Sequence, residues 1–345
     1  MKIANFDLNE KVLIVAELSA NHKQDINLAK ETIYAMKEAG ANAVKLQTYT
    51  PDTLTIDCDN KYFQIKQGTL WDGKTLYELY KQAYTPWEWH LELKELAEKL
   101  GLVFFSTPFD KTAVDFLEEL NVTIYKVASF EITDIPLIEY IASKGKPMII
   151  STGIATIEDI KLAVETCKKN GCNDITLLKC TSAYPAPFEE ANLLTIPDMK
   201  NRFGVTVGLS DHTLGISVPI AAVALGARVI EKHFILDKKL GGPDAAFSLE
   251  PKEFKAMVSS IREVEKALGK VTYEISEKVE KSRIFARSLF VVKDIKAGDF
   301  LTNDNIRSIR PGYGLHPKYL KSVLGKKAKY DLAKGTPLKL EFITE

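Results

Sequence analysis

The chain of 345 residues is predicted to be an α/β protein, with a (β/α)8 barrel in residues 1–270 and a small β-rich domain after it. Three observations predict this arrangement. Short apolar runs alternate with amphipathic helical stretches over the first 270 residues, which is typical of parallel βα units. Eight such runs can be counted, and a Lys- and Glu-rich segment without an apolar pattern follows them.

The eight apolar runs are the predicted barrel strands. Their nearly continuous hydrophobicity suits strands that are buried on both faces. In chain order they span residues 12–16, 43–46, 102–105, 123–127, 147–150, 175–178, 204–208 and 228–231. An open doubly wound sheet with a phosphate loop would show GxGxxG after the first strand, and none is present there, so the closed barrel is favoured.

Amphipathic stretches between the runs are the predicted helices. Residues 27–39, 86–100, 157–169 and 251–268 each place apolar side chains near the i, i+3, i+4 spacing of one helical face. The last stretch starts at Pro251, a residue that suits the first turn of a helix. These helices are expected to cover the outside of the barrel.

The texture of the sequence changes after Leu268. Residues 271–285, which include VTYEISEKVEKSR, are too polar for barrel core and predict an extended linker. Residues 286–345 hold short β-like runs broken by Lys-Ala-Gly, Arg-Pro-Gly-Tyr-Gly and Lys-Gly-Thr-Pro turns. They predict a second domain of marginal size.

Composition excludes several classes of partner. The 46 basic residues balance 46 acidic ones, so no global field draws the protein to nucleic acid or to an anionic membrane. No apolar stretch approaches the roughly 20 residues of a membrane span. The N-terminal segment lacks the cleavage site of a signal peptide, and a cytoplasmic location is expected. The four cysteines show no CxxC pair, which predicts buried, reduced thiols.

Polar residues stand at or just after the end of every apolar run, and in a barrel these ends converge on one face. A Ser or Thr after a single strand is more often a helix cap, but here the pattern recurs at all eight runs. Two lysines with several hydroxyls predict a pocket for a substrate that carries both carboxylate and phosphate. In chain order the residues are Glu17, Asn21, His22, Lys45, Gln47, Ser106, Thr107, Lys126, Ser129, Glu131, Ser151, Thr152, Thr181, Ser182, Tyr184, Ser210, Asp211, His212, Glu231 and His233.

Two histidines predict a metal site. His212 and His233 follow the seventh and eighth runs, which are neighbours in a closed barrel, so one divalent ion could bind both imidazoles. Two protein ligands leave positions open for substrate, and Mn²⁺, Mg²⁺, Co²⁺ or Zn²⁺ would be admitted. His22 is a weaker candidate for substrate contact, and His90 is predicted to lie on a helix surface.

Together these motifs resemble the sialic acid synthase family across nearly the whole chain. AELSANH, VKLQTY, STPF, YKVASFE, STG, CTSAYP, GLSDHT and EKHF stand in family order, followed by GGPDAAFSLEP and IRPGYGLHP. The resemblance implies a TIM barrel followed by an antifreeze-like (SAF) domain. It also implies a bacterial-type cytoplasmic transferase that uses phosphoenolpyruvate, and a domain-swapped homodimer in which the small domain covers the partner's active site.

One motif separates branches of this family. Members that make N-acetylneuraminic acid typically carry CTNxYP, whereas this chain has Ser182 in CTSAYP. With AELSANH and GGPDAAFSLEP, this motif is similar to the pseudaminic acid synthase branch. The implied substrate is 2,4-diacetamido-2,4,6-trideoxy-L-altrose, and the implied products are pseudaminic acid and phosphate, formed by C–O cleavage. A synthase for N-acetylneuraminic or legionaminic acid is the alternative on the same barrel.

The resemblance also implies roles for individual residues. His212 and His233 would hold the metal (Mn²⁺, Mg²⁺ or Co²⁺), Glu17 would act at the aldehyde end of the sugar and Glu131 would orient water, although either glutamate could instead fix a lysine. Lys45 and Thr107 would bind the carboxylate of phosphoenolpyruvate. The phosphate would lie against Lys126, Ser129, Ser151, Ser182 and Ser210. Gln47, Tyr184 and Asp244 would contact the acetamido sugar, with Arg310 reaching it across the dimer.

Two further functions are weighed against this one. A metal-dependent aldolase on the same fold would also use two histidines and a phosphate site. An ice-binding or scaffolding protein is suggested by the antifreeze-like tail alone. Arg307, Arg310 and the many lysines of the tail argue against a flat, weakly charged ice-binding face.

Overall fold

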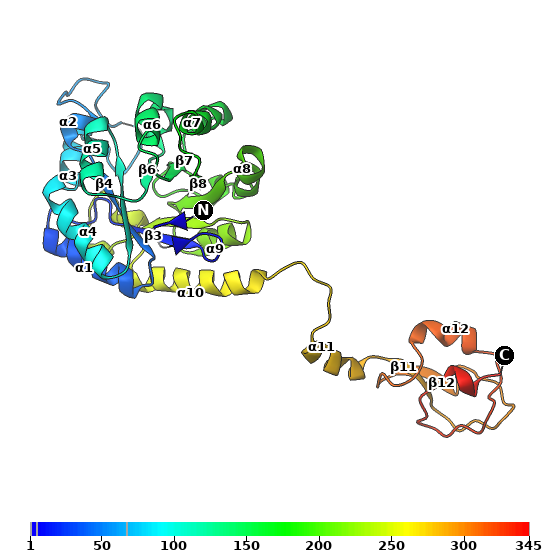
Figure 1. Cartoon of the computed structure of the whole chain (residues 1–345). Helices are drawn as coiled ribbons and strands as arrows, with labels where there is room; N and C mark the ends of the chain where they lie inside the picture. The colour runs from blue at the N-terminus through cyan, green and yellow to red at the C-terminus, as the bar shows by residue number, and fades with distance from the viewer. Residues whose placement is uncertain (1, 5, 67, 345) are drawn as a thin grey trace. The chain divides into compact units, whose positions relative to one another are not determined.

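The computed structural model describes residues 2–4, 6–66 and 68–344, which form two compact units, Met1–Gly269 and Lys270–Glu345. Within the described residues, eight parallel strands of the first unit close into a barrel in the order β10-β3-β4-β5-β6-β7-β8-β9 (Figure 1). The barrel closes because β10 pairs with both β9 and β3. The strands are β3 (Leu13–Glu17), β4 (Ala43–Thr48), β5 (Val103–Pro108), β6 (Tyr125–Val127), β7 (Met148–Ser151), β8 (Ile175–Cys180), β9 (Thr206–Asp211) and β10 (Val229–His233).

Each predicted apolar run is confirmed as a barrel strand, and the predicted fold class is confirmed with it. Most strands run further than the apolar pattern suggests at their C-terminal ends. β4, for example, ends at Thr48, and β10 ends at His233. The polar residues at these ends therefore belong to the sheet itself, and the parallel ladders fix their positions.

Side-chain alternation divides the barrel interior into an apolar floor and a polar top. The floor includes Leu13, Val15, Phe105 and Leu178, all fully buried in one cluster. Because successive side chains of a strand point to opposite faces, Glu17, two residues after Val15, points inward as well. An N-terminal hairpin of β1 (Lys2–Ile3) and β2 (Phe6–Asp7), which the sequence analysis did not predict, adds apolar side chains to the floor.

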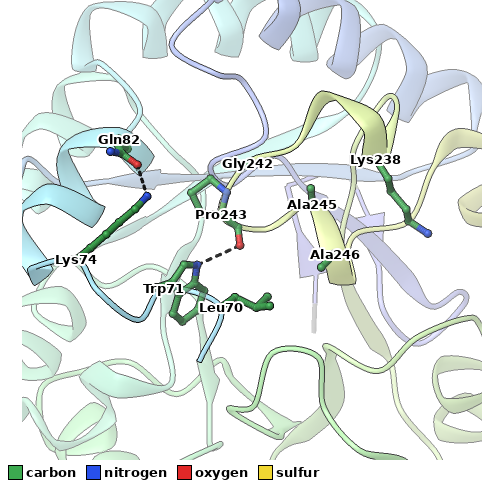
Figure 2. Close-up of a pocket in the computed structure, with 9 residues that line it drawn as sticks. All are labelled: Leu70, Trp71, Lys74, Gln82, Lys238, Gly242, Pro243, Ala245 and Ala246. Carbon is green, nitrogen blue, oxygen red and sulfur yellow. Dashed lines mark hydrogen bonds between the residues drawn. The ribbon is translucent and has the colours of Figure 1, made fainter. Parts of the chain in front are cut away.

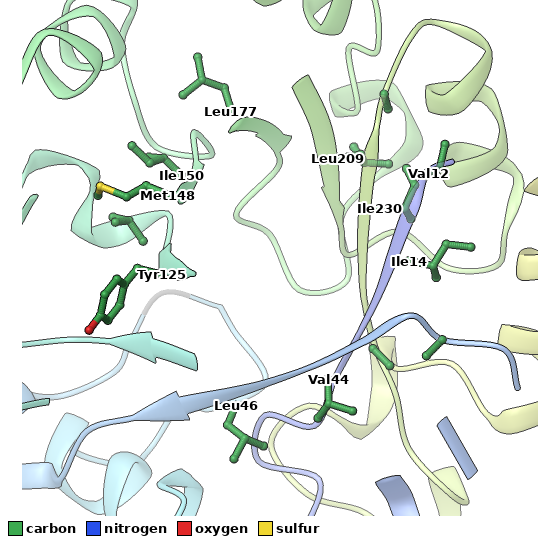
Figure 3. Packing of buried hydrophobic residues seen from close by; sticks show 14 of the residues in the cluster. Val12, Ile14, Val44, Leu46, Tyr125, Met148, Ile150, Leu177, Leu209 and Ile230 are labelled. Atoms are coloured by element: carbon green, nitrogen blue, oxygen red, sulfur yellow. The ribbon is translucent and has the colours of Figure 1, made fainter. Parts of the chain in front are cut away.

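The outward faces of the strands pack against a ring of helices. Figure 3 shows part of this outer core, with strand residues such as Ile14, Val44 and Ile230 among its members. The helices are α1 (Ile26–Glu38), α2 (Pro51–Leu54), α3 (Leu76–Ala83), α4 (His90–Lys99), α5 (Lys111–Glu119), α6 (Ile135–Ala142), α7 (Ile157–Lys169), α8 (Thr195–Phe203), α9 (Ser217–Ala224) and α10 (Pro251–Leu268). The four predicted helices are confirmed as α1, α4, α7 and α10, although a 3-10 turn (Trp87–Trp89) precedes α4.

Capping explains why the predicted bounds of α7 agree with the structure. The Thr156 hydroxyl accepts the backbone N–H of Asp159, and the Asp159 carboxylate accepts the backbone N–H of Thr156 at 2.9 Å. Such a reciprocal pair satisfies N–H groups that the first turn leaves free.

The second unit has its own core. β11 (Ser288–Val291) pairs antiparallel with β12 (Ile306–Ile309), and α12 (Leu320–Val323) lies in the same unit. Leu289, Val291 and Leu301 are among its buried apolar residues. Residues 277–282 form a short helix, α11 (Glu277–Ser282), where the sequence predicts an extended linker, because the Ser276 hydroxyl caps its first turn. No helix among the described residues is long and apolar enough to cross a membrane.

Candidate active site

A buried network of charges lies at the polar top of the barrel. Lys45 Nζ is 3.0 Å from Glu17 Oε2 and 2.9 Å from Glu231 Oε1, and all three side chains are nearly inaccessible. Burial alone would lower the pKa of Lys45, but the two carboxylates outweigh it and raise that pKa. Burial likewise opposes ionisation of Glu17, but His233 and Lys45 hold its pKa well below the usual range. Lys45 and Glu17 are therefore both charged.

Lys126 is a second buried cation with weaker compensation. Its Nζ donates to Ser151 Oγ at 2.7 Å and to the Val127 carbonyl at 2.9 Å, and Glu231 Oε1 is 3.8 Å away. Burial lowers the pKa of Lys126, since the nearest carboxylate stabilises the charge only partly. An anion bound here would supply the missing negative charge.

Serine hydroxyls surround the same region. Ser182 Oγ donates to Ser129 Oγ at 2.8 Å, and the backbone N–H of Ile154 donates to Ser129 Oγ at 3.1 Å. Gly153 permits this arrangement, because a Cβ there would lie 2.2 Å from Ser182 Oγ and 2.6 Å from Ser129 Oγ. The requirement for glycine at 153 is not visible in the STG motif, where the residue looks like a simple turn.

Two other buried hydroxyls lie at the polar top of the barrel. Ser210 Oγ donates to Glu231 Oε1 at 2.9 Å, and this glutamate thus holds a lysine and a serine at once. Thr107 Oγ1 is buried without a hydrogen-bond partner among the described residues, as is Glu231 Oε2. A buried hydroxyl without a partner is costly unless a ligand satisfies it, so Thr107 is suited to contact a bound substrate.

The two predicted metal-binding histidines lie side by side. The ring centroids of His212 and His233 are 5.3 Å apart. His212 Nδ1 lies 3.1 Å from the Thr181 carbonyl, which can only accept, so Nδ1 carries the proton and Nε2 keeps its lone pair. Burial, with a smaller effect from His233, lowers the pKa of His212 to about 3. A neutral imidazole with one nitrogen fixed by a carbonyl is the form that binds a metal.

Carboxylates stand next to His233. Its Nε2 is 3.2 Å from Glu17 Oε2, and its Nδ1 is 3.6 Å from Asp244 Oδ2 without forming a hydrogen bond. Across the described residues, no three His, Cys, Asp or Glu side chains already form a metal-binding group. The two imidazoles nevertheless fit a divalent cation whose other ligands come from substrate and water, since the ring of His233 lies near two carboxylates and its Nδ1 has no hydrogen-bond partner among the described residues.

A buried ion pair on the outer face of the sheet links the strands that carry these histidines. Lys232 is fully buried and donates both to Asp211 and to the Thr213 carbonyl. Because Asp211 precedes His212 and Lys232 precedes His233, the pair ties the end of β9 to the end of β10. The pair therefore fixes the backbone beside both histidines.

Aromatic side chains form the upper wall of the site. The ring of Tyr184 lies 4.6 Å from that of His212, and the ring of Phe247 lies 4.9 Å from that of His233. Trp71, on the loop before α3, is 5.5 Å from Tyr184. Trp71 was not predicted as a site residue, because it is far from any strand end and only the folded loop brings it there.

The structure brings most of the predicted site residues together at this end of the barrel. Gln47 Nε2 donates to Glu17 Oε1 at 3.0 Å and to Ser19 Oγ at 2.9 Å. Glu131 follows β6, with Oε2 buried and unpartnered, and burial raises its pKa to about 7 although Lys126 opposes the shift. Arg310 is exposed in the second unit, so its predicted contact with the sugar stays a prediction.

Two predictions need correction. His90 is fully buried rather than on a surface, because it faces inward at the start of α4, where its Nε2 is 2.9 Å from Thr48 Oγ1. Burial lowers its pKa to about 4. Three of the four free cysteines are buried as predicted, but Cys58 is only half-buried. His22, the weaker candidate for substrate contact, is fully buried, and its ring packs edge-on against Trp89 with the ring centroids 5.5 Å apart.

The barrel, the buried lysines and the paired imidazoles define an enzyme site for an anionic substrate. The model of the NeuB family matches residues 32–273, and that of the SAF domain matches residues 286–344. The chain therefore belongs to the NeuB family.

Several known proteins are similar to this chain. It is 54% identical to a pseudaminic acid synthase of Helicobacter pylori, over 96% of this chain and 97% of that protein. It is 40% identical to an N,N'-diacetyllegionaminic acid synthase of Legionella pneumophila, over 96% and 94%. Among solved structures, the N-acetylneuraminic acid synthetase of Leptospira borgpetersenii, in complex with citrate, matches with a TM-score of 0.73 and 35% identity, over 82% of this chain and 94% of that one.

Proposed function

We propose that the protein is a pseudaminic acid synthase, which condenses phosphoenolpyruvate with 2,4-diacetamido-2,4,6-trideoxy-L-altrose and releases phosphate. The observation that carries this proposal is the 54% identity to the Helicobacter pylori pseudaminic acid synthase along nearly the whole of both chains. The legionaminic acid synthase, which represents the alternative, is less similar at 40%. We also infer a cytoplasmic enzyme, because phosphoenolpyruvate is a metabolite of that compartment.

The geometry of the barrel top supports a binding mode for phosphoenolpyruvate. Lys45 and the unpartnered Thr107 hydroxyl take its carboxylate. Lys126, whose charge is only partly compensated, takes the phosphate with the hydroxyls of Ser129, Ser151, Ser182 and Ser210. Each hydrogen bond to such a charged group contributes about 1.5–3 kcal/mol. Because the carboxylate and the phosphate are bound at separate places, the direction in which C3 of phosphoenolpyruvate faces is fixed.

His212 and His233 would hold the divalent cation, Mn²⁺, Mg²⁺ or Co²⁺. When bound there, the cation supplies Lewis acidity for the aldehyde oxygen of the sugar. Burial keeps His212 neutral, and the Thr181 carbonyl orients its ring before any ligand arrives. Asp244, beside His233, and Gln47, beside Glu17, are placed to orient hydroxyl or acetamido groups of the sugar.

The condensation itself uses two glutamates. C3 of phosphoenolpyruvate attacks the aldehyde carbon, water adds at C2, and the C2–O bond then breaks to release phosphate. Glu17 is ionised and fixed by Lys45 and Gln47, so it positions the aldehyde end. Glu131, with a pKa near 7, can take a proton from the water and return it, as general acid–base catalysis requires.

One assay tests the proposal. The protein is incubated with phosphoenolpyruvate, Mn²⁺ and either the altrose derivative or N-acetylmannosamine, and released phosphate is measured. Phosphate with the altrose derivative is expected, whereas phosphate with N-acetylmannosamine alone would contradict the proposal. Phosphoenolpyruvate labelled at its bridging oxygen gives a second test. C–O cleavage carries the label into the released phosphate, whereas an aldolase releases no phosphate.

We further infer a domain-swapped dimer in which Arg310 of one protomer contacts the acetamido group in the other's site. Arg310 is exposed on its own unit, which leaves its guanidinium available. Mixing an Arg310→Ala chain with a His233→Ala chain is expected to restore part of the activity, because one site of each mixed dimer is then intact. Inactive mixtures whose dimers are proven mixed would refute the swap.

A further inference from the structure

A cavity opens between two loops that follow different strands. It has a volume of about 510 Å³ and is lined by Leu70, Trp71, Lys74, Gln82, Lys238, Gly242, Pro243, Ala245 and Ala246 (Figure 2). Trp71 connects it to the site already described, because its ring lies 5.5 Å from Tyr184, which in turn lies 4.6 Å from His212. A sugar whose aldehyde reaches the histidines would therefore extend toward this cavity.

The loops that form the cavity are held together. Trp71 Nε1 donates to the Pro243 carbonyl at 3.2 Å, as Figure 2 shows. Asp72 fixes the turn that carries Trp71, accepting the backbone N–H groups of Gly68 and Thr69 at 2.9 Å. Gly242, with φ at 127°, adopts a conformation that other residues rarely reach and turns the chain so that Pro243 meets the indole. The indole is thus presented in a defined place.

The lining of the cavity offers apolar surface to a ligand. Leu70, Trp71 and Ala246 contribute apolar surface beside Pro243 and Ala245. Both lysines of the lining are already engaged. Lys74 donates to Gln82 Oε1 at 2.6 Å, and Lys238 pairs with Glu253 at 2.8 Å. Glu253 thus neutralises Lys238, whereas Lys74 keeps its positive charge beside a neutral amide.

We propose that Trp71 is a specificity-determining residue, whose indole forms the wall that receives the methyl-bearing groups of the acceptor sugar. This inference rests on the proposed function. The altrose derivative carries a C6 methyl group and two acetamido methyl groups, whereas N-acetylmannosamine has a hydroxymethyl group at C6 and one acetamido group. A large rigid aromatic face binds methyl groups and gives nothing to a hydroxymethyl group, which prefers water.

Steady-state kinetics of Trp71→Ala and Trp71→Phe test this role. Removing a wall that contacts methyl groups changes discrimination by roughly 10-fold or more, so Trp71→Ala is expected to raise the KM for the altrose derivative by that factor. Trp71→Phe retains a ring and is expected to fall between. The KM for phosphoenolpyruvate stays unchanged in both. Tyr62→Phe is the control, because Tyr62 precedes Trp71 in the same loop, is 76% exposed and is absent from the cavity lining.

Equal sugar KM values in wild type and Trp71→Ala would overturn the inference, and so would a parallel rise in the KM for phosphoenolpyruvate. Fluorescence gives a second readout, since the chain has three tryptophans, of which Trp87 is fixed by the Tyr49 carbonyl and by Phe116. Adding the altrose derivative without phosphoenolpyruvate is expected to shift the emission of wild type and not that of Trp71→Phe. An equal shift in both proteins would place the sugar elsewhere.

The proposed function and this inference fail in different ways. If the wild type releases no phosphate with the altrose derivative, the proposed function is refuted. If the wild type releases phosphate and the Trp71 variants keep its sugar KM and its preference over N-acetylmannosamine, only the role of Trp71 is refuted.

Discussion

Substitution of Gly153 by alanine should disable the part of the site that we propose to bind phosphate. A Cβ at this position would lie 2.2 Å from Ser182 Oγ and 2.6 Å from Ser129 Oγ, and real Cβ contacts essentially never fall below 3.0 Å. To reach even that separation, the two hydroxyls must retreat by 0.8 and 0.4 Å, respectively. The Ser182–Ser129 hydrogen bond of 2.8 Å would not survive this movement in its present geometry.

The energetic cost has two parts. Overpacking of this kind destabilises a fold by about 1–3 kcal/mol. Each serine hydroxyl that no longer reaches the phosphate removes a bond worth about 1.5–3 kcal/mol, which corresponds to roughly 10- to 150-fold in affinity. Gly153→Ala is therefore expected to raise the KM for phosphoenolpyruvate by at least 10-fold, with a modest loss of thermal stability.

Phosphate release at varied phosphoenolpyruvate, together with thermal unfolding, measures both effects. Adding Ser129→Ala and Ser182→Ala to Gly153→Ala removes the atoms that clash, so stability should recover while the affinity for phosphoenolpyruvate stays low. A Gly153→Ala enzyme with the wild-type KM would refute the assignment of these serines to the phosphate.

Three further predictions follow from the buried groups of the site. His233→Ala should abolish turnover and Mn²⁺ binding, measured by calorimetry, while the circular dichroism spectrum is retained; activity with normal metal dependence would remove this residue from the site. Burial raises the pKa of Glu131 from 4.5 to about 7, so the native state holds a proton that the unfolded chain releases in that window. As the pH rises through this window, the wild type should lose about 3 kcal/mol of stability relative to Glu131→Gln. If denaturant unfolding gives the same stability difference between the two proteins at both ends of the window, the prediction is refuted. Lys232→Met leaves the Asp211 carboxylate buried without its partner and should cost about 3–5 kcal/mol in denaturant unfolding, part of which Lys232→Met/Asp211→Leu recovers; if the double variant is no more stable than the single one, the pair is not the cause.

The barrel could be predicted because its strands are buried on both faces, which leaves apolar runs that a sequence shows directly. The position of the site followed from the same fact, since the ends of parallel strands converge. Lys45, Lys126, His212 and His233 meet for this reason. Strand order alone could not predict which side chains pair, such as the ion pair between Glu231 and Lys45 at 2.9 Å.

Other features depend on tertiary contacts that leave no local pattern. Trp71 reaches the site only because its loop folds over Tyr184. Gly153 is required by two side chains that come from other strand ends. His90 was predicted to lie on a helix surface, but at the start of α4 its side chain faces Thr48 on a strand. In each case the decisive neighbour is distant in sequence.

The charge balance of the site explains why substrate and cation should depend on each other. Glu17 and Glu231 are buried with Lys45 and Lys126, so two carboxylates face two ammonium groups before any ligand binds. Phosphoenolpyruvate adds a carboxylate and a phosphate to this balanced, water-poor environment, where uncompensated charge is costly. The His212 imidazole contributes no positive charge, since burial keeps it unprotonated. A divalent cation at the histidine pair would supply the compensation. The affinity for phosphoenolpyruvate should therefore be higher with the cation than without it.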